Sequence, residues 1–478
     1  MKFGKTKELH FIGIGGIGMS GMAELLLNQN YKVSGSDINF SERVKRLKKL
    51  GAEIYLDHSL GNIKTPDVVI YSSAVSIHNP EIIAAKNKKI PVIRRAEMLG
   101  ELLKIKSTSV AVAGSHGKTT TSSMLGSILF HANLNPTLII GGIVNEFGSN
   151  SITGKGDCIV VEADEFDKSF LMLQPTYSII NNLDEEHMEC YENFDDLRSA
   201  FIDFANSVPF YGSISICTDS VNVRSLIKDL SKPFTTYAIS QDADFVAQDI
   251  KFSNNDTEFN LAFDNKKIKL NLKVPGLHNV YNALGAISVA CHLGVNIDDI
   301  KKGLERYTGV KRRFDIKFNN KVIIVDDYAH HPEEISATID AARCGWNRRV
   351  VVIFQPHLFT RTRNFHLDFA RALSKSDIVF INGNGQKRYD YMGEMYISCP
   401  FNEGYNAKKI INNYSLGFSR NANRRNLSVS YPNGKYDRTK RILFFNIYPK
   451  VKPGGTINIS KKQVKEKAKK DRIPKCLA

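Results

Sequence analysis

Two glycine-rich segments constrain this chain most, because each lies between a short apolar run and a helix-like pattern. The first, G-I-G-G-I-G at 13–18, follows residues 9–12, which are apolar except for His10. The second, G-S-H-G-K-T-T at 114–120, follows the apolar residues 110–113. A strand, a glycine turn and a helix form the first half of a βαβ unit, whose helices cover a parallel sheet. The sequence therefore predicts an α/β protein with at least two such units.

The first glycine loop has the setting of a nucleotide-diphosphate site. Glycines such as Gly15 and Gly18 let the backbone approach a pyrophosphate at the helix N-terminus. Asp37 lies 19 residues past Gly18, at the end of the next apolar run, where an acid can reach a ribose hydroxyl. The pattern does not distinguish NAD from a UDP-sugar, and a tight turn without a ligand is the alternative.

The second loop contains the Gly-Lys-Thr core of a P-loop. Its backbone N–H groups would cradle the β-phosphate, Lys118 would neutralise phosphate charge, and Thr119 or Thr120 would ligate Mg²⁺. The pattern is a shortened variant, because Val112 stands where the full P-loop has its first glycine. For His116, a loop-packing role and a phosphate contact are both open.

Acidic residues follow two further predicted strands. Glu162 ends the apolar run 158–161, with more acids directly after it, and the segment N-N-L-D-E-E-H at 181–187 follows the other strand. These oxygens and the His187 imidazole suit one or two divalent cations near the phosphates. Solvated acidic loops and a packed histidine are the alternatives.

Downstream, the amides of Asn279 and Asn282 either bind an adenine edge or cap a helix. The segment G-V-K-R-R-F at 309–314 supplies arginine for a phosphate clamp, or else is a charged linker. Two more segments, 326–332 and 355–362, end predicted strands, where α/β sheets bind ligands. We therefore expect a substrate cleft there rather than a metal site.

A length of 478 residues suggests about three domains. We expect a nucleotide-substrate domain at 1–105, a central domain at 106–313, the start of a third domain at 314–381 and a divergent basic tail at 382–478. Residues 233–275 alternate apolar and polar side chains around Asn and Asp pairs, which predicts a β insertion in the central domain.

The basic character of the chain is confined to its last part. The net charge is +16, but residues 382–478 hold 21 Lys and Arg against 6 Asp and Glu, a net of +15, which leaves +1 for the first 381 residues. The high isoelectric point therefore does not indicate a nucleic-acid partner for the body of the protein. A nucleic-acid-binding protein that works through the tail stays as a rival hypothesis, which a steep salt dependence would reveal.

Other classes of protein are disfavoured. The longest uncharged stretch, 119–145, is interrupted by His, Asn and Pro, so no membrane span is expected. The N-terminus lacks the features of a signal peptide, and the seven cysteines are scattered, odd in number and free of Cys-x-x-Cys spacing. We expect a cytoplasmic protein without a disulfide framework or zinc site, and the oligomeric state stays open.

Taken together, eight motifs resemble the Mur ligases of peptidoglycan synthesis, in order, over about residues 8–381. They are HFIGIGGIGMSGM (10–22), AGSHGKTTT (113–121), EADEFDKSFL (162–171), NNLDEEHMECY (181–191), GLHNVYNA (276–283), GVKRRF (309–314), DDYAHHP (326–332) and QPHLFTRT (355–362).

This resemblance implies a three-domain α/β enzyme. A Rossmann-like domain would hold UDP, a central P-loop ATPase domain with the β insertion would follow, and a Rossmann-like C-terminal domain would bring the amino acid. The implied reaction is an ATP- and Mg²⁺-dependent ligation of UDP-N-acetylmuramate and L-alanine. The lactoyl carboxylate attacks the γ-phosphate, and the amine then attacks the acyl phosphate. Preference for alanine over glycine or serine stays open.

The resemblance also assigns roles to residues by their place in these motifs. The UDP-substrate site would contain Gly15, Gly16, Gly18, Met19, Ser20 and Asp37. The ATP site would contain Gly114, Ser115, His116, Gly117, Lys118, Thr119, Thr120, Asn279, Asn282 and Asp327. The metal ligands would be Thr119, Glu162 and His187. The catalytic groups would be Lys118, His278, Arg313 and His330, and further substrate contacts would come from His357 and Arg361.

The sequence departs from the family pattern in two places. Phe166 stands where the family has Ser. After Ile381 the expected Tyr-Pro-Ala-Arg-Glu-like segment and Met-Gly-Ala-Gly-like strand end are missing. We infer that the tail from about 382 onward comes from a shifted reading frame, which would leave a third sheet of three strands and an impaired ligase. A basic extension that folds separately or binds RNA is the alternative.

A rival from another enzyme class is an NAD-dependent oxidoreductase that uses the first glycine loop. This hypothesis gives no role to the P-loop or to the clusters around Glu162 and His187.

Overall fold

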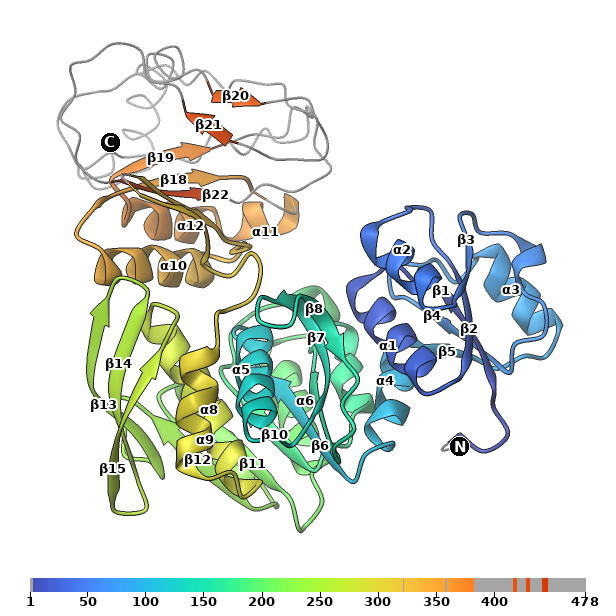
Figure 1. Cartoon of the computed structure of the whole chain (residues 1–478), viewed down its shortest axis with the longest axis horizontal. Coiled ribbons are helices and arrows are strands. Elements are labelled where there is room, and N and C mark those ends of the chain that lie inside the picture. The colour runs from blue at the N-terminus through green and yellow to red at the C-terminus, as the bar shows by residue number, and fades with distance from the viewer. Residues whose placement is uncertain are drawn as a thin grey trace. The chain divides into compact units, whose positions relative to one another are not determined.

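The computed structural model describes residues 3–320, 322–356 and 359–381, together with short strands at 416–418, 427–429 and 441–445. It divides into two compact units, with the division between Lys311 and Arg312 (Figure 1).

The first unit begins with a parallel sheet in the order β3-β2-β1-β4-β5. The strand order reverses between β1 and β4, so the glycine loop after β1 lies at the crevice where such sheets bind ligands. The elements are β1 (Glu8–Ile12), α1 (Ile17–Asn28), β2 (Lys32–Ser36), α2 (Glu42–Lys49), β3 (Glu53–Tyr55), η1 (Leu60–Asn62), β4 (Val68–Tyr71), α3 (Pro80–Asn87), β5 (Val92–Arg94) and α4 (Arg95–Leu103).

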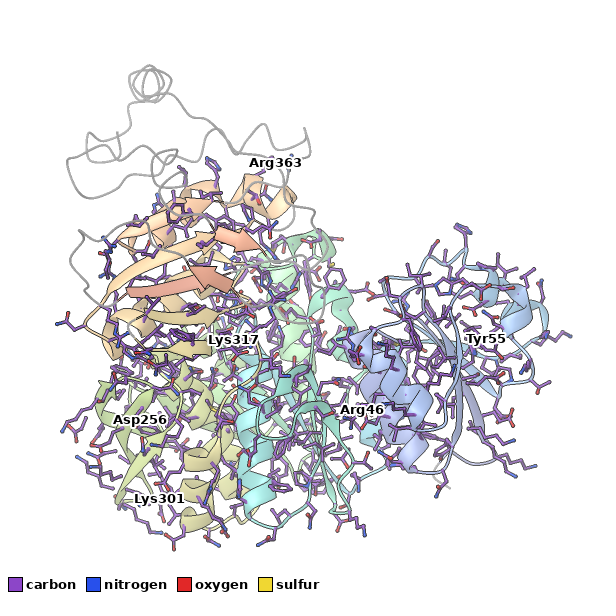
Figure 2. The ribbon with its side chains drawn as sticks, turned by 45° about the horizontal axis from the view of Figure 1, so that its top comes forward. Arg46, Tyr55, Asp256, Lys301, Lys317 and Arg363 are labelled. Carbon is purple, nitrogen blue, oxygen red and sulfur yellow. The ribbon has the colours of Figure 1, made fainter. Side chains whose placement is uncertain are left out.

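An ion pair holds the first two helices of this sheet together. Arg46 of α2, labelled in Figure 2, donates to both carboxylate oxygens of Glu24 on α1, over 3.0 and 2.5 Å. Because bidentate geometry orients both partners, this pair orients α1, whose N-terminus carries the glycine loop.

The remainder of the first unit is a ten-stranded sheet in the order β15-β14-β13-β12-β11-β10-β6-β9-β7-β8. Helices α5, α8 and α9 pack against one another over it (Figure 1). Its elements are β6 (Thr108–Ala113), α5 (Lys118–His131), β7 (Thr137–Val144), β8 (Ser149–Ile152), β9 (Cys158–Glu162), η2 (Phe166–Met172), β10 (Tyr177–Ile180), η3 (Met188–Cys190), α6 (Phe194–Asn206), β11 (Ser213–Cys217), α7 (Val221–Arg224), η4 (Ile227–Asp229), β12 (Phe234–Ala238), β13 (Phe245–Ser253), β14 (Asp256–Phe263), β15 (Lys266–Leu272), α8 (Leu277–His292) and α9 (Ile297–Arg306).

The predicted β insertion is confirmed as two hairpins, β13-β14 and β14-β15. Their turns place Asn254, Asp264 and Asn265 at positive φ, a conformation that Asn and Asp tolerate better than most residues. The hairpins extend the central sheet, because β13 pairs in parallel with β12.

Helix α4 connects the two sheets and is packed into the central one. Its Leu99 and Leu102 are buried in a core that also contains Val161 and Phe170. At Gly100 a Cβ atom would lie 2.5 Å from the carbonyl oxygen of Met172, so only glycine allows the helix to approach η2 this closely.

The second unit contains a five-stranded sheet in the order β16-β17-β22-β18-β19. Its elements are β16 (Asp315–Asn319), β17 (Val322–Asp326), α10 (Pro332–Gly345), β18 (Arg349–Phe354), α11 (Phe359–Asn364), α12 (His366–Ser374), β19 (Ile378–Ile381) and β22 (Arg441–Phe445), with β20 (Leu416–Phe418) and β21 (Leu427–Val429) as a separate antiparallel pair.

The expectation that the third sheet is left with three strands was wrong. Strand β22, from the region interpreted as a divergent tail, pairs in parallel with both β17 and β18 and lies between them. In the sequence, residues 442–445 are all apolar, a pattern that a central strand of a parallel sheet favours. The rest of 382–478 lies outside the described residues.

Candidate active site

The P-loop lies between β6 and α5, as the sequence predicts. Gly117 is the residue before the helix and has φ 81°, and a Cβ there would lie 2.3 Å from Oδ1 of Asn282. Both the backbone conformation and the close approach therefore require glycine. The helix N-terminus that follows directs its backbone N–H groups toward the loop, where an anion binds favourably.

Lys118 is held beneath the loop by three oxygen atoms. Its Nζ donates to the carbonyl oxygens of Gly114 (2.6 Å) and Ser115 (3.3 Å) and to Oε2 of Glu165 (2.7 Å). Burial works against the ammonium, but the carboxylates of Glu165 and Asp164 outweigh it, so the pKa of Lys118 is raised. Lys118 is therefore a permanent positive charge in the loop.

Glu165 is the functional residue that sequence reasoning missed. Only 1 % of its side chain is exposed, and the ion pair with Lys118 spans 47 residues of sequence. Burial raises the pKa of Glu165, which favours the neutral acid, but the contact with an ammonium stabilises the carboxylate, so we treat the pair as ionised. The acidic run after β9 was the available signal, although it does not show which acid turns inward.

A network of buried amides braces the P-loop. Asn282 accepts from the hydroxyl of Thr121 (3.1 Å), and Thr121 accepts from Nδ2 of Asn181 (3.0 Å). Asn279 donates to the carbonyl of Pro275 (2.7 Å). The cap of α8 is Gly276 without a side-chain hydrogen bond, so these asparagines are not helix caps. The predicted contact with adenine stays a prediction for both.

Thr119 and Glu162 are brought together as the metal prediction requires. The Thr119 hydroxyl donates to Oε2 of Glu162 (3.1 Å), and the N–H of Gly141 donates to Oε1 (2.5 Å). A Cβ on Gly141 would lie 2.8 Å from the same carboxylate. The glycine in β7 thus makes room for Glu162.

His187 lies in a second cluster. Ligand atoms of Asp164, Glu165 and His187 all lie within 4.8 Å of one another. Oε1 of Glu165 is buried without a hydrogen bond among the described residues, which suits a cation. Asp164 and Glu162 line the same pocket, so this cluster adjoins the Thr119–Glu162 pair. The oxygen-rich donor set fits Mg²⁺ or Mn²⁺.

Phe166, the departure from the family pattern, packs against this cluster. Its ring meets the His187 imidazole edge to face, with centroids 5.2 Å apart. His187 itself has φ 56°. The phenylalanine therefore restricts the imidazole on one side.

His116 faces two acids on the far wall of the loop. Its Nε2 lies 3.5 Å from a carboxylate oxygen of Asp184, and its Nδ1 lies 3.9 Å from one of Glu186. Its backbone N–H donates to the side chain of Asn182 (2.7 Å). These contacts support the loop-packing role, while the phosphate contact stays a prediction. Thr120 follows in the first turn of α5 and is partly exposed.

In the first sheet, Asp37 binds the glycine loop directly. Its Oδ2 accepts from the N–H of Gly15 over 2.9 Å, and a Cβ on Gly15 would lie 2.7 Å from the same oxygen. Met19 is 1 % exposed, and the hydroxyl of Ser20 donates to the carbonyl of Ile17 (3.0 Å). Asp37 and the loop are thus adjacent as predicted, whereas the side chains of Met19 and Ser20 turn inward.

Gly16 and Gly18 have no side chains, so they do not cover the backbone at the start of α1. Gly16 is the residue before the helix, and Gly18 lies in its first turn. Asn150 of β8 donates to the carbonyl of Ile17 (2.8 Å), which ties this turn to the central sheet. The UDP role of these glycines stays a prediction.

In the second unit, Arg313 and His330 share one acid. Arg313 donates to Oε1 of Glu334 (3.1 Å), and Nδ1 of His330 lies 3.1 Å from Oε2. Asp327 is 8 % exposed, and its two oxygens accept from the N–H groups of Phe314 (2.8 Å) and Ala329 (2.7 Å). Asp327 thus shapes the turn after β17, and its predicted ATP contact is untested.

His331, next to His330, is buried at the start of α10. Burial lowers its pKa to about 4, and the positive charge of Arg361 on α11 adds to this. The substrate contact predicted for Arg361 stays a prediction. His357 lies outside the described residues. His278, in the first turn of α8, is half-buried.

Within the described ranges, no helix has the length and apolar character needed to cross a bilayer.

Sequence models of three domains match the chain in order. They are the Mur ligase family catalytic domain at 8–107, the Mur ligase middle domain at 112–290 and the Mur ligase glutamate ligase domain at 312–398. The first glycine loop falls within the first match and the P-loop within the second, and the third match begins where the second compact unit begins. The chain belongs to the Mur ligase family and has its three-domain α/β fold.

Two similar relatives and one similar solved structure are alanine ligases by name. A UDP-N-acetylmuramate–L-alanine ligase of Geotalea daltonii is 46% identical over 381 residues, which cover 79% of this chain and 83% of the relative. One of Chlorobaculum tepidum is 45% identical over 401 residues, covering 82% and 84%. The crystal structure of a UDP-N-acetylmuramate–alanine ligase from Thermotoga maritima superposes with a TM-score of 0.73 at 30% identity, covering 92% of this chain and 96% of that one.

Proposed function

We propose that this chain is a cytoplasmic ligase that joins L-alanine to the lactoyl carboxylate of UDP-N-acetylmuramate, with ATP as phosphoryl donor. The observation that carries the proposal is the charged, buried Lys118 beneath a P-loop, beside Thr119 and Glu162. The names of relatives that are 45–46% identical supply the two substrates.

A carboxylate is a poor electrophile, so it must first be activated. In the proposed reaction the lactoyl carboxylate attacks the γ-phosphorus of ATP, and ADP leaves. The amine of L-alanine then attacks the carbonyl carbon of the acyl phosphate, and phosphate leaves from the tetrahedral intermediate. The Lys118 ammonium and the N-terminus of α5 offset the charge on the transferring phosphoryl group.

We assign Thr119, Glu162 and His187 to hold Mg²⁺, with Asp164 and Glu165 adjoining. When bound, Mg²⁺ neutralises phosphate charge and orients the phosphates. In the second unit, Arg313 and His330 are proposed to serve the amino-acid step, with Glu334 fixing both.

The test is ADP release by the full chain with UDP-N-acetylmuramate, L-alanine, ATP and Mg²⁺, each omitted in turn. We expect repeated turnover only with all four present. Omission of L-alanine alone allows at most about one ADP per enzyme molecule, because ADP leaves before the amine reacts. Glycine and L-serine replace alanine in parallel reactions and define the preference for the amino acid. Release that does not depend on UDP-N-acetylmuramate contradicts the proposal.

Calorimetry tests the oxidoreductase rival on the same protein. We expect binding of UDP-N-acetylmuramate and none of NAD, because the first glycine loop stands in one compact unit with a P-loop. Tight binding of NAD would overturn the ligase assignment.

A further inference from the structure

Arg95 is a charged residue to which the proposed reaction gives no role. It is the first residue of α4 and is half-buried. Among the described residues, its guanidinium forms no ion pair and no hydrogen bond. Its neighbour Arg94 differs, since it is 58% exposed and lies 3.9 Å from the carboxylate of Asp167. A half-buried guanidinium without an anion is costly, because burial removes water from the charge without compensation.

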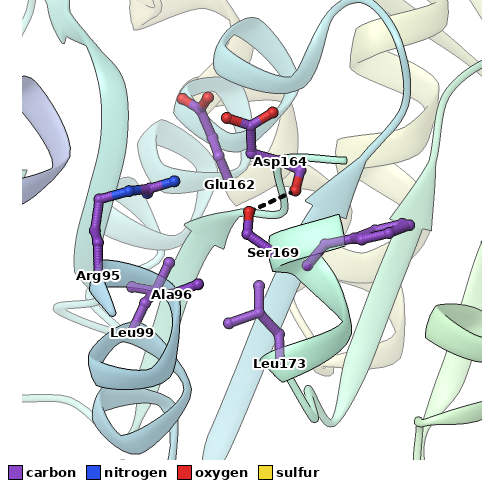
Figure 3. Close-up of a pocket in the computed structure, with 8 residues that line it drawn as sticks. Arg95, Ala96, Leu99, Glu162, Asp164, Ser169 and Leu173 are labelled. Atoms are coloured by element: carbon purple, nitrogen blue, oxygen red, sulfur yellow. Dashed lines mark hydrogen bonds between the residues drawn. The ribbon is translucent and has the colours of Figure 1, made fainter. Parts of the chain in front are cut away.

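The side chain of Arg95 lines a small pocket. Glu162 and Asp164 lie on the opposite wall, and Leu99 and Leu173 form the floor (Figure 3). The wall that carries Asp164 is held in place by Ser169, whose hydroxyl donates to the Asp164 carbonyl over 2.9 Å. The pocket thus presents one cationic group opposite two carboxylates that we assign to the metal region.

Arg95 also contacts the first glycine loop. A Cβ atom built on Gly18 would lie 3.4 Å from Nη1 of Arg95, so the guanidinium packs against the first turn of α1. Gly18 is the residue that allows this approach. Arg95 therefore lies between the loop assigned to the UDP-sugar and the carboxylates assigned to the metal.

The position of Arg95 is fixed by the packing of α4. The close contact at Gly100 sets the helix against η2, and the N–H of Arg94 donates to Oε1 of Glu97 (3.2 Å) at the helix start. The Arg95 side chain thus begins from a rigid backbone, and less conformational entropy is lost when it binds a ligand.

We propose that Arg95 binds an oxyanion of the UDP-sugar substrate and spans the distance between the two sites of the first unit. The inference rests on the proposed function. The planar guanidinium forms two parallel hydrogen bonds with a phosphate or a carboxylate. The UDP-sugar offers both, in its diphosphate and in its lactoyl group. On this assignment Mg²⁺ would compensate the charges of Glu162 and Asp164, and the substrate oxyanion would compensate that of Arg95.

Calorimetric titration of the full chain tests this proposal with two ligands. UDP-N-acetylmuramate carries both oxyanions, and UDP-N-acetylglucosamine has the diphosphate but no lactoyl group. For Arg95→Ala we expect the Kd of UDP-N-acetylmuramate to rise about 10- to 100-fold. For Arg95→Lys, which keeps the charge but loses the fork, we expect a smaller rise, about 3- to 10-fold. Arg94→Ala is the matched control and should leave Kd unchanged.

The two ligands distinguish the two oxyanions. Equal weakening of both assigns Arg95 to the diphosphate, and weakening confined to UDP-N-acetylmuramate assigns it to the lactoyl carboxylate. A Kd within twofold of wild type for both Arg95 variants overturns the inference and leaves the proposed function intact. A wild-type chain that does not bind UDP-N-acetylmuramate overturns the proposed function instead. If Arg95→Ala does not fold, Arg95→Lys decides.

Discussion

Replacement of Lys118 by alanine should have two effects, one on ATP turnover and one on the free energy of unfolding, because the ammonium contributes to both. Loss of a charge that stabilises the transferring phosphoryl group should lower ATP turnover on the order of 10³-fold or more. Removal of the ammonium also leaves Glu165, 1 % exposed, without its partner, and breaking a buried pair costs about 3–5 kcal/mol of unfolding free energy. Part of this cost is relieved because burial favours protonation of Glu165.

A double variant separates the two effects. Lys118→Ala combined with Glu165→Gln removes the uncompensated carboxylate, so unfolding free energy should recover toward wild type while ADP release stays low. Binding of UDP-N-acetylmuramate should persist in both variants, since the first glycine loop is in another sheet. ADP release within tenfold of wild type for Lys118→Ala refutes the role given to this residue.

Three further predictions concern other parts of the chain. Glu162→Gln and His187→Ala should each raise the Mg²⁺ concentration required for ADP release, whereas the exposed Glu189→Gln should not; an unchanged Mg²⁺ titration for both contradicts their role as ligands. Burial lowers the pKa of His331 from 6.5 to about 4, so the unfolded chain takes up a proton between these values that the folded chain does not. The free energy of unfolding therefore carries the full contribution of neutral His331 above pH 6.5, and it falls by about 3 kcal/mol as the pH is lowered to about 4. In urea unfolding, His331→Asn should remove this loss of stability at low pH. If the unfolding free energies of wild type and variant change with pH in the same way, His331 is not the cause. Finally, one of the other two reading frames downstream of codon 381 should encode Tyr-Pro-Ala-Arg-Glu-like and Met-Gly-Ala-Gly-like segments; if neither does, the tail is native.

The sequence predicted those elements that contiguous residues determine. The strands before both glycine loops and the helices after them are confirmed within a residue or two, because strand, turn and helix signals are all contiguous there. The hairpin turns at Asn254 and Asp264 were found for the same reason. Thr119 and Glu162, which the sequence assigned to one metal site, lie together because β6 and β9 are neighbours whose carboxyl ends meet; their metal role stays a prediction.

Features that depend on distant segments were missed. The sequence does not show that Glu165, rather than Asp164 or Asp167, turns inward to Lys118. The hairpin β7-β8 was overlooked because Gly141 and Gly142 weaken a strand pattern, whereas here Gly141 admits the carboxylate of Glu162. The position of β22 was unpredictable, because strand order is set by long-range pairing and not by local periodicity.

The amide network between α5 and α8 has a consequence for how the chain is made. Thr121 and Asn282 are separated by 161 residues. At about 5–20 residues per second, a ribosome needs about 8 to 30 s to travel this distance. Until α8 has emerged, a nascent chain contains the whole loop sequence and Asn181 but lacks Asn282, whose amide oxygen accepts from Thr121 and packs against Gly117. We therefore expect the fully braced loop, and with it tight binding of ATP, only when synthesis of the central domain is nearly finished.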